Sequence, residues 1–93
     1  MPSAPRQVLP HLPDVSDTVG QIYLKKQLTD SAVDAFEELV APQPARAIYR
    51  YHFGQAYAQK GERQKAIEEL QVALKSNPQK EEETQIRQLL QKL

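Results

Sequence analysis

The chain contains two copies of one sequence pattern. When its 93 residues are shifted against themselves so that Gly20 meets Gly54, small, aromatic and helix-breaking residues coincide in one register. The further pairs are Tyr23 with Tyr57, Ala32 with Ala66, and Pro44 with Pro78, and the shift that aligns them is the repeat period. Glycine and alanine allow two helices to approach closely, tyrosine fills the volume beside the crossing, and proline ends a helix. The sequence therefore predicts two copies of one helical hairpin.

Apolar residues recur every three or four positions in five segments, and no segment alternates with the period of a strand. The predicted helices cover residues 14–27, 31–41, 45–60, 63–76 and 79–92. Asp14 is placed to cap the first helix. Gly61 follows the third helix, where a left-handed residue is easiest, but Gln27 stands at the equivalent position of the first copy. The first turn is therefore expected to be strained by about 1 kcal/mol or to take another shape.

Residues 1–12 differ in composition from the rest of the chain. Four of the seven prolines, namely Pro2, Pro5, Pro10 and Pro13, are concentrated at this end, and such a segment cannot sustain a helix. Residues 1–12 are expected to form a flexible lead-in, in which Val8, Leu9 and Leu12 are the apolar groups able to dock. The helical domain is expected to span residues 13–93.

A 34-residue period with two helices in each unit resembles the tetratricopeptide repeat. The resemblance covers residues 13–93, and segments 17–23 and 49–57 look most like the last repeats of long bacterial proteins of this family. It implies an all-α fold, a right-handed α-solenoid of two hairpins, with repeat one at 13–46 and repeat two at 47–80. A capping helix at 79–93, polar on its outer face, would close the array.

Several classes of function are disfavoured by composition. The 12 basic and 12 acidic residues cancel, and the faint basic patch of Arg46, Arg50, Tyr51 and Lys60 does not suggest nucleic-acid binding. No apolar run reaches the roughly 20 residues of a membrane span. Cysteine is absent, and no nucleophile and base are spaced to act together. We therefore expect no enzymatic activity, no catalytic residue, no metal site and no cofactor.

The resemblance implies a binding surface, because the first helices of successive hairpins line a concave face. By register, the residues expected to face this groove are Asp17, Gln21, Leu24, Lys25, Ile48, Tyr51, His52, Gln55 and Gln59. Tyr51 is the expected anchor for a protein or peptide partner, because aromatic residues dominate interface energetics. The alternative is that these are ordinary exposed positions of a spacer repeat. Asp17 and Gln21 replace the basic clamp that grips terminal carboxylates in chaperone cofactors, so an acidic tail is not the expected ligand.

A second hypothesis is architectural. Two repeats fall short of the three or so that a stable array needs. Val15, Val19 and Ile22 form an apolar flank on the first helix that no preceding helix covers, and they could meet a second copy of the chain or further repeats of a larger array. Residues 1–44 carry three basic and six acidic groups, whereas residues 45–93 carry nine and six. This polarity could orient a partner or favour head-to-tail contacts.

Overall fold

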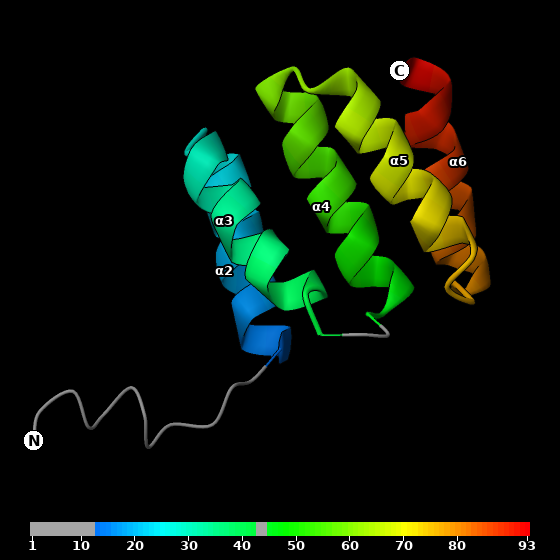
Figure 1. Ribbon diagram of the computed structural model, residues 1–93, viewed down its shortest axis with the longest axis horizontal. Coiled ribbons are helices and arrows are strands. Elements are labelled where there is room, and N and C mark those ends of the chain that lie inside the picture. Colours follow the sequence, from blue (N-terminus) through cyan, green and yellow to red (C-terminus); the bar gives the residue numbers. More distant parts are fainter. Residues whose placement is uncertain (1–12, 43–44) are drawn as a thin grey trace, which may run out of the picture.

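The computed structural model describes residues 13–42 and 45–93, and within them the regular secondary structure is all α-helix (Figure 1). The helices are α2 (Pro13–Lys25), α3 (Thr29–Val40), α4 (Ala47–Lys60), α5 (Arg63–Leu74) and α6 (Lys80–Lys92). The predicted all-α class, with two hairpins and a C-terminal helix, is confirmed. The expected lead-in and Pro44 lie outside the described residues.

The helix bounds differ slightly from the predicted ones. Helix α2 ends at Lys25 because Gln27 adopts a left-handed conformation with φ of 64°. Helix α5 ends at Leu74, and Asn77, before Pro78, is also left-handed, with φ of 55°. Helix α4 starts at Ala47 because Arg46 is extended (φ −69°, ψ 147°). Near these three helix ends the backbone therefore leaves the right-handed helical conformation.

The two hairpin turns have the same geometry. Gly61 is left-handed, with φ of 91°, and its N–H donates to the Ala58 carbonyl, while Glu62 N–H donates to Tyr57. At the equivalent positions of the first hairpin, Gln27 N–H donates to Leu24 and Leu28 N–H donates to Tyr23. Of the two predicted outcomes for the first turn, the chain therefore takes the strained one: Gln27 adopts the conformation that glycine adopts more easily.

Both hairpins place a helical glycine against a large apolar side chain. A Cβ atom on Gly20 would lie 2.5 Å from Phe36 Cε1, and one on Gly54 would lie 2.9 Å from Leu70 Cδ2. Phe36 and Leu70 are themselves one repeat period apart, and both are fully buried. The close approach predicted for the glycines is thus observed, but the group that needs the space is a large side chain of the second helix. Ala32 and Ala66 are also fully buried.

The core forms two clusters. The first joins α3 to α4 through a set of buried apolar side chains that includes Phe36, Leu39 and Phe53. The second joins α5 to α6 through Leu70, Ala73 and Ile86. Because the first cluster lies between the hairpins, it fixes how the second hairpin stacks on the first. The second cluster holds α6 against the outer side of the stack (Figure 1).

Asp14 does not cap the helix it belongs to. It lies in the first turn of α2, and its Oδ1 accepts a hydrogen bond of 2.6 Å from the Tyr49 hydroxyl. The Arg46 guanidinium lies 3.5 Å from the same carboxylate oxygen and 5.3 Å from the centre of the Tyr49 ring. The predicted cap is therefore replaced by a polar contact between α2 and α4.

Candidate protein-binding groove

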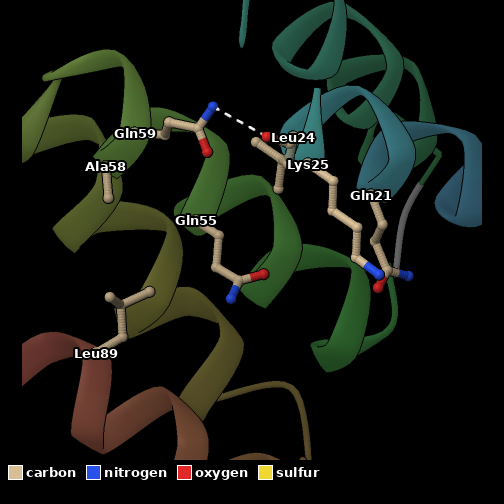
Figure 2. A pocket seen from close by; sticks show the side chains of 7 residues that line it. All are labelled: Gln21, Leu24, Lys25, Gln55, Ala58, Gln59 and Leu89. Carbon is tan, nitrogen blue, oxygen red and sulfur yellow. Dashed lines mark hydrogen bonds between the residues drawn. The ribbon is translucent and has the colours of Figure 1, made fainter. Parts of the chain in front are cut away.

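Helix α4 contacts both α2 and α6, and the three helices line one side of the molecule together. A groove of about 470 Å³ lies on this side (Figure 2). Its lining residues come from all three helices and are Gln21, Leu24, Lys25, Gln55, Ala58, Gln59 and Leu89. Five of the nine residues predicted to face a groove are in this set, namely Gln21, Leu24, Lys25, Gln55 and Gln59.

The groove follows the register of the repeat. Gln21, Gln55 and Leu89 occupy one repeating position, in α2, α4 and α6 respectively. Leu24 and Ala58 share a second position, and Lys25 and Gln59 share a third. Sequence reasoning omitted Ala58 and Leu89. Extending the register by one unit from Leu24 and Gln55 would have found both.

Two groove glutamines use their amide nitrogens inside the molecule. Gln21 Nε2 donates to Asp17 Oδ2 over 3.0 Å. Gln59 Nε2 donates to the Leu24 carbonyl over 3.3 Å, drawn as a dashed line in Figure 2, and to Thr29 Oγ1 over 2.9 Å. A carboxylate and a carbonyl can only accept, so these partners orient both amides. Within the described residues, the side-chain oxygens of both glutamines have no internal donor.

Asp17 and His52, both predicted to face the groove, are instead paired with each other. His52 Nδ1 lies 2.7 Å from Asp17 Oδ1, and both side chains are largely covered between α2 and α4. The His52 ring also packs against Phe36, with ring centroids 5.9 Å apart, and against Tyr51 at 5.5 Å. This pair ties the two hairpins together, and neither residue lines the groove.

Tyr51 and Ile48 also lie outside the groove lining. Tyr51 packs against the cluster of α5 and α6, and burial raises the pKa of its hydroxyl above the ordinary value. Its oxygen accepts a hydrogen bond of 3.2 Å from Gln55 Nε2. Ile48 is half-buried against the cluster of α3 and α4. The residue proposed as the anchor therefore borders the groove through Gln55 and also contributes to the packing of α6.

The polar character of the groove comes from amides and one cation. Lys25 is the charged residue among the lining side chains, and it is exposed. In residues 13–42 and 45–93, histidines and carboxylates nowhere gather in a group of three that could hold a metal ion. None of the described helices combines the length and apolar character needed to cross a membrane.

Residues 47–80, which comprise α4, α5 and the start of α6, match the family model of the tetratricopeptide repeat. This segment is a tetratricopeptide repeat. The matched segment corresponds to one period of the internal repetition. Tetratricopeptide repeats are in general non-catalytic modules of protein–protein interaction, and the groove is formed in part by the first helix of this one. Searches of curated proteins and of solved structures gave no match.

Proposed function

We propose that this chain is a non-catalytic interaction module that binds a segment of another polypeptide in the groove of α2, α4 and α6. The observation that carries the proposal is that α2, α4 and α6 contribute Gln21, Gln55 and Leu89, which share one position of the repeat, to a single groove. A linear ligand lying across such helices meets a repeating surface. The module needs no cofactor, and its lining of amides and aliphatic groups does not suit nucleic acid.

The chemistry of the lining indicates what kind of segment fits. The free side-chain oxygens of Gln21 and Gln59 can accept hydrogen bonds from the main-chain N–H groups of a bound peptide. Leu24 and Leu89 offer apolar contact for one of its side chains. Lys25 can donate to a peptide carbonyl or pair with a carboxylate. We therefore propose a ligand with one apolar anchor residue and neutral or weakly acidic character.

The groove assignment can be tested with a variant whose larger side chain obstructs the groove. Peptides selected on the intact chain from a displayed library would be labelled, and their affinity measured by fluorescence anisotropy. Ala58→Arg places a large cationic side chain in the groove and should weaken binding at least about tenfold, as expected when a binding pocket is obstructed. Ala58 is half-buried, so circular dichroism would first confirm that the variant folds.

The control is Val72→Arg. Val72 lies in helix α5, is 40% exposed, and lines neither the groove nor the cavity beside α2. The affinity of this variant for the selected peptides should equal that of the parent chain. Equal binding by Ala58→Arg and the parent would refute the groove assignment. Tyr51→Ala is a less selective test, because the Tyr51 ring also packs against α5 and α6.

A further inference from the structure

Helix α2 leaves one apolar face uncovered. Val15, Val19 and Ile22 are 56%, 38% and 45% exposed, and together they are called the open face below. A cavity of about 240 Å³ adjoins it, lined by Val15, Ser16, Val19 and Tyr23 of α2 and by Ala35 and Glu38 of α3. The open face is distinct from the groove, since no residue lines both cavities.

The repeat register shows what covers this position elsewhere in the molecule. One repeat period further along the chain, Val15, Val19 and Ile22 correspond to Tyr49, Phe53 and Ala56 of α4, which are only 6%, 4% and 0% exposed. The three α4 residues belong to the cluster shared with α3. Helix α3 packs against both α2 and α4. The open face is therefore a surface of the kind that a helix covers.

An exposed ion pair accompanies the same contact. Lys60, the last residue of α4, lies 3.4 Å from Asp30, the second residue of α3. The two helices are thus antiparallel at this contact. In the register of the repeat, Lys60 corresponds to Lys26, which is exposed just after α2. A helix seated on the open face as α3 sits on α4 would bring a carboxylate in its first turn to Lys26.

Among residues 13–42 and 45–93, no helix is left to cover the open face. Both α3 and α5 already pack against α4 and α6 with their apolar stripes. The exposed positions of α6 are polar, and among the described residues beyond the first hairpin the large exposed apolar side chain is Val72. Residues 1–12 contain no acidic side chain. A second copy would offer its own open face, but Asp14, the carboxylate in the first turn of α2, already accepts a hydrogen bond from Tyr49 of α4.

We infer that the open face binds an amphipathic helix of another polypeptide, seated as α3 is seated on α4, with an acidic side chain in its first turn pairing with Lys26. The helix would bury Val15, Val19 and Ile22 and extend the stack at its N-terminal end. This site does not depend on the groove, and the two can be occupied at the same time.

The probe is a synthetic peptide of residues 28–42 of this chain, which contains α3 and therefore has the required stripe and Asp30. It would be titrated into the ¹⁵N-labelled full chain, with amide shifts followed by NMR. An isolated helix of 12 residues is marginal in water, so the titration should extend to millimolar peptide. Shifts should concentrate on Val15, Val19, Ile22 and Lys26, and the Asp30→Lys peptide should bind several-fold more weakly.

A pair of valine variants provides the matched comparison. Val19→Asp places a charge in the open face and should weaken peptide binding at least about tenfold, because an unpaired charge would be buried. Val72→Asp introduces the same change at a valine of similar exposure, 40% against 38%, on the outside of α5, and should leave binding unchanged. The groove variant Ala58→Arg should also bind the peptide normally, so failure of the groove proposal would be seen separately.

Three results would overturn the inference. One is the absence of shifts on the open face at millimolar peptide, and another is unchanged binding by Val19→Asp. The third is a dimer of the parent chain in sedimentation equilibrium that Val19→Asp dissociates and Val72→Asp does not, because the occupant would then be a second copy.

Discussion

The two hairpin turns place different residues in one conformation. Gly61, at φ of 91°, adopts it without a steric penalty, whereas Gln27, at φ of 64°, brings its Cβ close to the following carbonyl oxygen. The hydrogen bonds around both residues are equivalent. The geometry of the turn is therefore imposed by the packing of the helices on either side, and the first hairpin tolerates a local cost that the second avoids.

Replacing Gln27 with glycine should relieve this cost. The left-handed penalty of about 1–2 kcal/mol disappears, while glycine adds roughly 0.4–1 kcal/mol of unfolded-state entropy, so we expect Gln27→Gly to stabilise the chain by about 0.5–1 kcal/mol. Urea unfolding followed by circular dichroism would measure the change. Gln85→Gly, an exposed position inside α6, is the control and should destabilise by about 1 kcal/mol. A lower urea midpoint for Gln27→Gly would contradict the argument.

At the level of elements, α2 and α4 occupy equivalent places but have different surroundings. Helix α4 contacts α2, α3, α5 and α6, whereas α2 contacts only α3 and α4 among the described helices. Asp14 and Asp17 of α2 both bond to side chains of α4, which adds polar links between the first helices of the hairpins. The stability of α2 therefore depends strongly on its packing against α3.

The two helical glycines test that dependence. A methyl group on Gly20 would overlap the ring of fully buried Phe36 at 2.5 Å, and overpacking of this kind costs about 1–3 kcal/mol. Alanine also gains about 1 kcal/mol in helix propensity. We expect Gly20→Ala to be destabilised overall, and Gly54→Ala, whose methyl group would meet Leu70 at 2.9 Å, to be affected less. Denaturant unfolding of both variants would compare them, and the opposite order would show that Phe36 can move aside.

At the level of the whole molecule, tyrosine side chains lie at several of the contacts between helices. Burial is the main cause that raises the pKa of Tyr49, Tyr51 and Tyr57 above the ordinary value of about 10. Tyr49 lies in the cluster of α3 and α4, and Tyr51 packs on α5 and α6. The Tyr57 ring packs at a tilt against Phe53, with ring centroids 4.5 Å apart. The protonated phenol is therefore the form that the folded chain favours at three places.

This raised pKa predicts a loss of stability in alkali. Above pH 10 the unfolded chain releases tyrosine protons that the folded chain still holds, so the free energy of unfolding falls as pH rises through the folded pKa values. The melting temperature should be insensitive to these groups below about pH 9 and should fall above about pH 10. Tyr57→Phe removes one of the three hydroxyls, and none of the hydrogen bonds of the described residues involves it. The melting temperature of this variant should fall less steeply with pH than that of the parent chain. An unchanged slope would rule out a contribution from Tyr57.

The sequence by itself determined the helices, the hairpin turns and the larger part of the groove. Each of these depends on a position that recurs with the period of the repeat, and in a stack every unit meets neighbours of the same kind, so a register predicts which side of a helix faces which neighbour. Gln21, Leu24 and Lys25 were found in this way, and Ala58 and Leu89 follow from the same rule.

Only the tertiary structure decided which polar side chains pair across the hairpins. Asp17 corresponds in register to Tyr51, and His52 to Thr18, so the contact between Asp17 and His52 joins residues that the repeat does not relate. Such a contact depends on the distance between two helices and on the rotamers that packing allows, and neither is encoded by periodicity. For the same reason Tyr51 looked like a free anchor in the sequence, although the approach of α6 covers much of its ring.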